Sequence, residues 1–274
     1  MAVLTRSYER VVMFSGGVGS WATAKRVADR HGTDHLTLLF ADTRVEDPDL
    51  YRFRDEAAAD IGAELVTVAD GRTPFEVFRD DRFLGNARLA NCSKYLKINP
   101  CRAWLEANRD PAHTIVYVGI DWTEQHRIPA TRHGWAPYRV EFPMCERPYF
   151  DKRQMLDALA GEGIAAPVAY AEGFPHNNCG QQGCVRGGQA YWHLVLRARP
   201  DAYARSEVAE QELRDHLDAD VAILRDRTAG DTRPMTLREF RERMENQGSL
   251  FDADEWAGCG CFTAGMPDKA RYGS

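Results

Sequence analysis

The chain has 274 residues, of which 44% are hydrophobic and 28% are charged, the composition of an ordinary globular protein. This excludes a disordered, collagenous or low-complexity protein. Lysine and arginine total 35 against 41 for aspartate and glutamate, so the formal net charge is −6. A nucleic-acid binder usually carries a basic excess, so this balance does not favour one, although a local basic face is compatible with it.

No apolar run approaches the roughly 18 residues that a membrane helix needs, and the first ten residues lack the pattern of a secretion signal. We therefore expect a cytoplasmic protein with no membrane partner. In that reducing compartment the seven cysteines are expected to be thiols, metal or cluster ligands, or catalytic groups rather than structural disulfides, and their odd number fits this expectation.

Strands and helices alternate in the first half of the chain. Apolar runs and helical spacing predict strands at 9–14, 35–41, 64–68 and 114–120, and helices at 21–30, 49–61 and 98–108. Short connections between alternating strands and helices predict an α/β fold with a doubly wound, mostly parallel sheet.

The pattern changes after about residue 143. We expect helices at 152–159, 190–196 and 202–217, a Gly/Asn/Cys-rich loop at 173–188, a strand at 221–224, and a flexible tail. The predicted organisation is therefore an α/β core over residues 1–145, with a mainly helical, cysteine-containing extension over residues 146–274 that packs on the core.

A glycine-rich loop follows the first predicted strand. Two serines bracket three glycines in Ser15-Gly16-Gly17-Val18-Gly19-Ser20, just before the first predicted helix. Glycines let a backbone approach an anion closely, and the N–H groups at the helix start point towards it. The loop therefore predicts a phosphate site in the 1–145 core; the alternative is a strand-to-helix turn with no ligand.

The loop is neither a Walker A loop nor a dinucleotide GxGxxG loop. It resembles the PP-loop, Ser-Gly-Gly-x-Asp-Ser, of the adenine nucleotide α-hydrolase (HUP-like) superfamily, and is most similar to PAPS-reductase-like (sulfonucleotide-reductase-like) proteins. Four further segments carry the resemblance, which spans most of residues 10–200: Phe40-Ala41-Asp42-Thr43, Cys92 to Lys97 with Pro100 and Trp104, Gly119 to Glu124 with Arg127, and Gly173 to Cys179.

The resemblance implies an adenine nucleotide site, with ATP (or PAPS or APS) and Mg²⁺ as ligands. It places Asp42 near the adenosine and Lys94 and Lys97 towards phosphates or sulfate. The two lysines would share one helix face, and the alternative is that this face is a solvated surface that binds no ligand. Arg127, like Arg88 and Arg132, is an anion candidate. Asp121 and Glu124 could hold Mg²⁺ or the ribose or, as exposed loop carboxylates, have no role. Gly119 is a further nucleotide-binding candidate, and His126 and His176 are candidate site histidines.

One position departs from the family pattern. Gly19 stands where the PP-loop has an aspartate near the pyrophosphate and its Mg²⁺. Either another carboxylate, such as Asp42 or Asp121, is a ligand of the metal, or hydrolysis is weak and the site mainly binds its nucleotide. The resemblance implies that loops that bind sulfonucleotides, which have no pyrophosphate, often lack the pair of glycines. This chain keeps Gly16-Gly17, which favours ATP as the ligand.

The cysteines form no CxxC pair, so the spacing of a zinc ribbon is absent. Cys179 and Cys184 are separated by glycines that suit a metal or cluster, and with Cys145 or the terminal pair they could supply an iron–sulfur centre, which the relatives often carry. The alternative is free thiols. Cys259 and Cys261 resemble the cysteine on the C-terminal tail of sulfonucleotide reductases, where a thiolate attacks sulfur or carries it as a persulfide.

Three functions follow from these observations. The first is a PP-loop enzyme that cleaves ATP to AMP and pyrophosphate, with coupling to sulfur transfer or nucleotide modification left open. The second is a sulfonucleotide reductase that uses Cys259 or Cys261 and a thioredoxin-like reductant. The third is a catalytically degraded nucleotide-binding partner in a phage, plasmid or CRISPR-associated nucleic-acid complex. Whether the chain forms a homodimer or takes a sulfur donor stays open.

Overall fold

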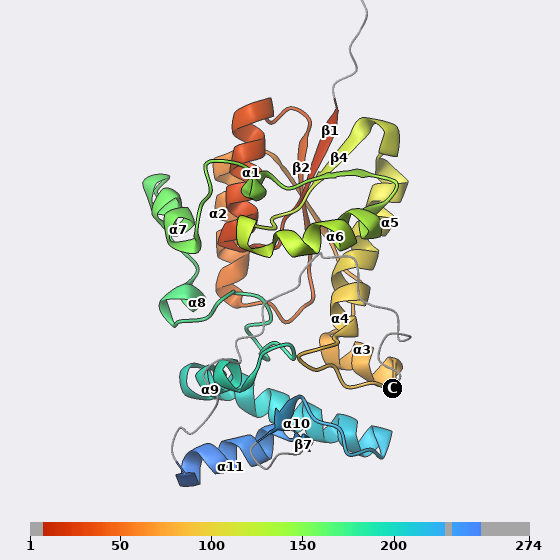
Figure 1. Ribbon diagram of the computed structural model, residues 1–274, viewed down its shortest axis with the longest axis vertical. Coiled ribbons are helices and arrows are strands. Elements are labelled where there is room, and N and C mark those ends of the chain that lie inside the picture. The colour runs from red at the N-terminus through yellow and green to blue at the C-terminus, as the bar shows by residue number, and fades with distance from the viewer. Residues whose placement is uncertain (1–7, 228–231, 248–274) are drawn as a thin grey trace, which may run out of the picture.

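The computed structural model describes residues 8–227 and 232–247. Its centre is a five-stranded parallel sheet with the order β3-β2-β1-β4-β5 (Figure 1). The strands are β1 (Glu9–Met13), β2 (Leu36–Ala41), β3 (Glu64–Val68), β4 (Thr114–Tyr117) and β5 (Arg139–Glu141). Because the first strand lies in the middle, the chain winds outwards in both directions, and the carboxyl ends of β1 and β4 lie side by side.

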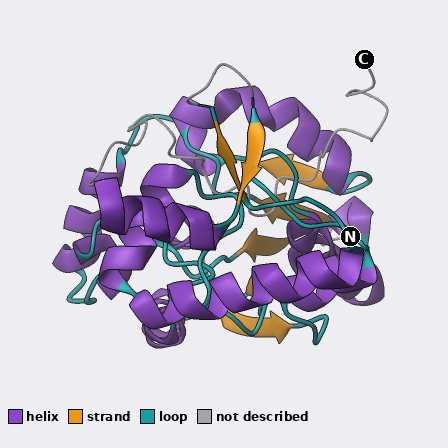
Figure 2. Cartoon of the chain, turned by 90° about the horizontal axis from the view of Figure 1, so that it is seen from below, coloured by secondary structure: helices purple, strands orange, loops and turns teal. Residues whose placement is uncertain are grey.

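Alternate residues of the central strands are buried on opposite faces of the sheet, since side chains along a strand point to opposite sides. Val12 of β1 packs in one apolar cluster with α1 (Val18–His31), α2 (Pro48–Ile61) and α7 (Lys152–Gly161). Val11 packs in a second cluster with α5 (Asn99–Asn108) and α6 (Ile128–Trp135). Helices thus cover both faces of the strands (Figure 2).

A second group of elements lies at the lower end of Figure 1 and has its own apolar core, centred on Trp192, Tyr203 and Phe240. It brings α3 (Pro74–Asp80) against a helix more than 100 residues later in the chain, α10 (Pro200–Leu217). The other members are α8 (Val168–Ala171), α9 (Gln189–Ala198), α11 (Leu237–Gln247) and an antiparallel pair, β6 (Leu224–Asp226) and β7 (Arg233–Met235).

The predicted fold class is confirmed: the sheet is parallel, the first half alternates strands and helices, and the second half is mainly helical. The strand predicted at 221–224 is displaced to β6, which belongs to the small antiparallel pair. The division at residue 145 stays a prediction, and the predicted tail lies outside the described residues. Among the described helices, none combines the length and apolarity needed to cross a membrane.

Glu210 of α10 is a buried carboxyl group that connects three elements. Its side chain is 1% exposed and accepts hydrogen bonds from the backbone N–H groups of Ile223 (2.8 Å) and Leu237 (2.6 Å). Burial raises the pKa of Glu210 from 4.5 to about 7. The folded protein therefore binds this proton more tightly than the unfolded chain does.

We predict that the free energy of unfolding falls by about 3 kcal/mol as the pH rises from about 4.5 to about 7. The folded protein loses its more tightly held proton over this range, and each pKa unit corresponds to about 1.4 kcal/mol. Urea unfolding at a series of pH values should show this slope. Glu210→Gln should remove it, whereas Glu212→Gln, at an exposed position of the same helix, should leave it. An equal slope in Glu210→Gln would contradict the assignment.

Candidate functional site

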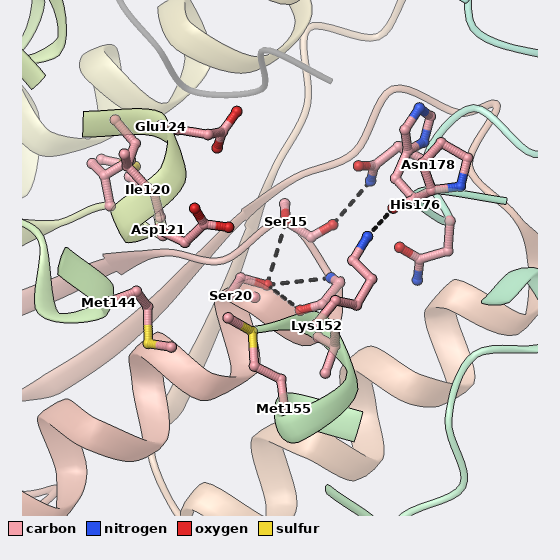
Figure 3. Close-up of a pocket in the computed structure, with 18 of the residues that line it drawn as sticks. Ser15, Ser20, Ile120, Asp121, Glu124, Met144, Lys152, Met155, His176 and Asn178 are labelled. Carbon is pink, nitrogen blue, oxygen red and sulfur yellow. Dashed lines mark hydrogen bonds between the residues drawn. The ribbon is translucent and has the colours of Figure 1, made fainter. Parts of the chain in front are cut away.

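A cleft opens where β1 and β4 end, the edge at which parallel α/β sheets bind ligands. With the open solvent at its mouth included, it encloses about 880 Å³. In Figure 3 the glycine-rich loop lies on one side and the segment after β4 on the other. The predicted residues that line it are Ser15, Gly17, Val18, Gly19, Ser20, Gly119, Asp121, Glu124, Arg127 and His176.

The glycine-rich loop is arranged around the start of α1. Ser20 Oγ donates to the Gly17 carbonyl (2.8 Å) and accepts from the Gly17 N–H (3.2 Å), while Ser15 Oγ lies 3.4 Å from Ser20 Oγ. The first turn of α1 holds no acidic residue. A helix start of this kind, with its N–H groups and positive dipole end in a cleft, is suited to an anion such as a phosphate.

Two of the glycines are required by geometry. Gly16 has φ +73°, and a Cβ at this position would lie 2.8 Å from a Leu50 methyl carbon. At Gly119 a Cβ would lie 3.0 Å from Thr23 Oγ1, because the end of β4 passes close to the start of α1. Gly19 is different, since no atom lies within 4 Å of a Cβ built there. A Cβ atom would therefore fit at position 19 without a clash.

Two amides from the 173–188 segment hold the loop from outside. Asn177 Nδ2 donates to the Gly16 carbonyl (2.7 Å), and Asn178 Nδ2 donates to the Ser15 carbonyl (3.1 Å). Asn177 is 2% exposed, and its Oδ1 has no hydrogen-bond partner within the described residues. We assigned these asparagines no role from the sequence, although they lie within the Gly173 to Cys179 segment that carries the resemblance.

The facing wall carries opposite charges. Asp121 and Glu124 point into the cleft in Figure 3, and Glu124 forms an ion pair with Arg127. Lys152, at the start of α7, reaches in from a third element and donates to the Pro175 carbonyl. Burial lowers the pKa of Lys152, an effect that Asp121 and Glu124 oppose. Sequence reasoning missed Lys152, because it comes from a helix that no motif marks.

The two carboxylates suit Mg²⁺, which takes oxygen ligands and usually binds through one or two carboxylates plus substrate phosphates. Asp121 Oδ1 accepts from Thr123 N (2.8 Å) and Oγ1 (2.6 Å), which fixes its orientation, and its second oxygen has no hydrogen bond among the described contacts. In residues 8–227 and 232–247, no group of three or more His, Cys, Asp or Glu side chains is arranged to hold a metal ion. A metal bound by Asp121 and Glu124 would therefore need its other ligands from water or from a bound phosphate.

Several predicted residues lie outside the cleft. Gly16 shapes the loop from behind, and Asp42 accepts from the Tyr51 hydroxyl (2.8 Å) and the Arg44 N–H (2.8 Å). Lys94 is exposed, with its Nζ 5.7 Å from the centre of the Tyr95 ring. The sequence does not show which strand-end residues turn into a cleft, because that depends on the loops that cover the sheet.

The expectation that Lys94 and Lys97 share a helix face is wrong. Residues Lys94–Ile98 form a π-helical turn, whose wider i→i+5 geometry separates side chains that lie three apart. Lys97 is 4% exposed, and its Nζ lies 3.0 Å from Oε1 of Glu46, which is fully buried. Burial alone would lower the pKa of Lys97, but the Glu46 carboxylate outweighs it and the pKa is raised.

Cys179 and Cys184 lie next to the cleft, in the segment that follows the two asparagines. The interaction between the two thiols lowers the pKa of Cys184 and raises that of Cys179, and the nearby His176 also lowers the pKa of Cys184. Cys145 donates to the Ile120 carbonyl (3.2 Å) instead, and the structure does not bring it into a metal-binding group with the pair. An iron–sulfur centre therefore does not fit the described cysteines alone; Cys259 and Cys261 lie outside the described residues.

Comparison of the sequence with protein-family models and with curated proteins finds no match. Among solved structures, the chain is similar to a phosphoadenylyl-sulfate (PAPS) reductase from Candida auris in a phosphate complex (15% identity, TM-score 0.45, 63% of this chain and 81% of that one). It is also similar to an NMN synthetase from Francisella tularensis (12% identity, TM-score 0.43, 77% of this chain and 87% of that one). Both likenesses are distant.

We predict opposite effects from alanine at two glycines of the loop. Gly16→Ala should destabilise the protein by about 1–3 kcal/mol and weaken ATP binding, because φ is positive and Leu50 blocks the added carbon. Gly19→Ala should leave stability equal or raise it by up to about 1 kcal/mol, because position 19 lies in α1 and is open. Thermal unfolding and calorimetric titration with ATP measure both, and equal losses in the two variants would contradict this account.

For Lys97 we predict a structural effect. Lys97→Met should cost about 3–5 kcal/mol, because Glu46 would stay buried without its partner. The double variant Lys97→Met/Glu46→Gln should regain much of this loss, measured by urea unfolding, and should bind ATP like the parent protein. If the double variant were stable but failed to bind ATP, Lys97 would have to be a ligand.

Proposed function

We propose that this protein is an adenine-nucleotide α-hydrolase of the PP-loop type, which binds ATP and cleaves it between the α- and β-phosphates to AMP and pyrophosphate. The observation that carries the proposal is the convergence, in one cleft, of the Ser15–Ser20 loop, the start of α1 and the carboxylates Asp121 and Glu124. Together they offer anion donors on one side and metal ligands on the other.

In this proposal the protein acts by positioning and by neutralising charge. The N–H groups at the start of α1, the hydroxyls of Ser15 and Ser20, and Lys152 bind the departing pyrophosphate. Mg²⁺, held by Asp121 and Glu124, supplies neutralisation of phosphate charge when bound. Arg127 neutralises charge from the same wall. The bond from the α-phosphorus to the bridging oxygen breaks as an acceptor oxygen, from water or a second substrate, bonds to the α-phosphorus.

We predict Mg²⁺-dependent release of AMP and pyrophosphate from labelled ATP. The double variant Asp121→Asn/Glu124→Gln should lower the rate by about 100-fold or more, since it removes both carboxylates that hold the metal. Glu106→Gln, at an exposed position on α5, is the matched control and should retain the parent rate. Absence of both ATP binding and AMP formation in the parent protein would overturn the proposal.

ATP turnover of the Gly19→Asp variant would distinguish a catalytically competent site from a degraded one. The new carboxylate would enter open space, so the substitution should fold. If Asp121 and Glu124 suffice for Mg²⁺, turnover should stay unchanged. A large gain would instead indicate a degraded site and favour the nucleotide-binding accessory protein of a nucleic-acid complex.

A second candidate function, thiol-dependent sulfonucleotide reduction, is favoured by one observation: the lowered pKa of Cys184, whose neighbour His176 also lines the nucleotide cleft. A cysteine thiolate is the form that attacks sulfur. Sulfite release from PAPS or APS with a dithiol reductant, lost in Cys259→Ser, Cys261→Ser or Cys184→Ser, would support this function. Inertness towards both substrates would dismiss it.

A further inference from the structure

Two adjoining hollows form a groove at the end of the molecule that carries α3, α10 and the β6–β7 pair (Figure 1). They hold about 680 Å³ and about 350 Å³ including their mouths, and they share Asn86 and Arg225 in their walls. The turn at residues 86–89 forms one side of the groove. Neither hollow includes a residue of the nucleotide cleft, so this is a separate surface.

Arginines surround this groove. Arg82 and Arg225 line the larger hollow, and Arg88, Arg225 and Arg227 line the smaller one; all four are exposed. Within residues 8–227 and 232–247, Arg82, Arg88 and Arg225 make no ion pair with a carboxylate, unlike Arg199 or Arg243. Three guanidinium groups in one groove thus present uncompensated positive charge.

Nearby carboxylates do not cancel this charge, because other arginines already pair with them. Asp226, next to Arg225, lies 2.6 Å from Arg243 and 3.0 Å from Arg233. Asp220, which lines the larger hollow, lies 2.9 Å from Arg214. The surface next to Asp220 also carries Asp215 and Asp218, so the positively charged groove ends at Asp220.

The backbone holds two of the arginines in fixed places. Asn86 Oδ1 accepts from the N–H groups of Arg88 (3.0 Å) and Leu89 (3.3 Å), which stiffens the turn that presents Arg88. Arg225 lies between the buried residues Leu224 and Asp226 of β6, so its side chain points outwards, and Gln189 Nε2 donates to its carbonyl (2.9 Å). These contacts fix the backbone at both arginines, so a ligand bound there would have to order only their side chains.

We propose that this groove binds a single strand of nucleic acid. Guanidinium groups suit phosphates, and their spread over two hollows suits several phosphates of one chain rather than a single phosphate. Apolar side chains also line the larger hollow: Phe83, Leu84, Leu217, Val221, Ala222 and Pro234. Unpaired bases can pack on such side chains while the arginines contact the nucleic-acid backbone, whereas a duplex keeps its bases stacked inside.

The test uses the full-length protein and fluorescein-labelled oligonucleotides of about 20 nucleotides, a length that covers more than one strand-binding site. Fluorescence anisotropy should show binding of oligothymidylate or oligouridylate that weakens as salt rises, and comparison of the two shows whether DNA or RNA is preferred. Arg88→Ala/Arg225→Ala should weaken binding about tenfold or more and lower the log–log salt slope by about 1.4, since each lost phosphate contact removes about 0.7.

The control Arg139→Ala/Arg153→Ala removes the same charge from arginines that are 62% and 90% exposed on β5 and α7, and it should bind like the parent protein. Thermal unfolding and ATP titration verify that both double variants are folded. The proposal is overturned if the parent protein does not bind the strands, if both double variants weaken binding equally, or if duplex DNA or heparin of similar charge binds as tightly. None of these readouts depends on ATP cleavage.

Discussion

Two amide groups hold the phosphate loop in shape. A loop of glycines has little conformational preference of its own, so something must fix its carbonyls if its N–H groups are to face an anion. Asn177 and Asn178 supply this by donating to the carbonyls of Gly16 and Ser15 across more than 150 residues of sequence. The glycine-rich loop is therefore held in shape by the second half of the chain.

The segment that carries these amides is itself held by a buried charge. Glu46 is fully buried; its carboxylate accepts from the backbone N–H of Cys179 (2.7 Å) and the hydroxyl of Thr43 (2.9 Å), and pairs with Lys97. A buried ion pair is tolerated only when its remaining hydrogen-bonding positions are filled, as they are here. The connection runs from the π-helical turn that holds Lys97 through Glu46 to the backbone of Cys179, which directly follows the two asparagines.

Local signals in the sequence were sufficient for four of the five strands of the central sheet, whereas the three-residue strand β5 (Arg139–Glu141) was not predicted. The apolar run of β2 and the capped start of α2, where Asp47 accepts from Asp49 N (2.9 Å), can be read within a few residues. The sequence could not show that Lys97 turns inwards, because a π-helical turn has no marked spacing, nor that Lys152 reaches the cleft from a separate helix. Both depend on contacts between distant segments, which one sequence does not display.

The net charge of −6 does not determine which ligands a local site can bind. Carboxylates engage about half of the arginines in the described residues, as Asp47 and Glu172 engage Arg199. Cations without such a partner add up to uncompensated positive charge only where several of them gather. Net charge governs long-range attraction and solubility, whereas a groove recognises its ligand through the charges within a Debye length of about 8–10 Å. A protein with a net negative charge can thus have a local site that binds anions by close contact, while the rest of its surface repels anions that do not fit this site.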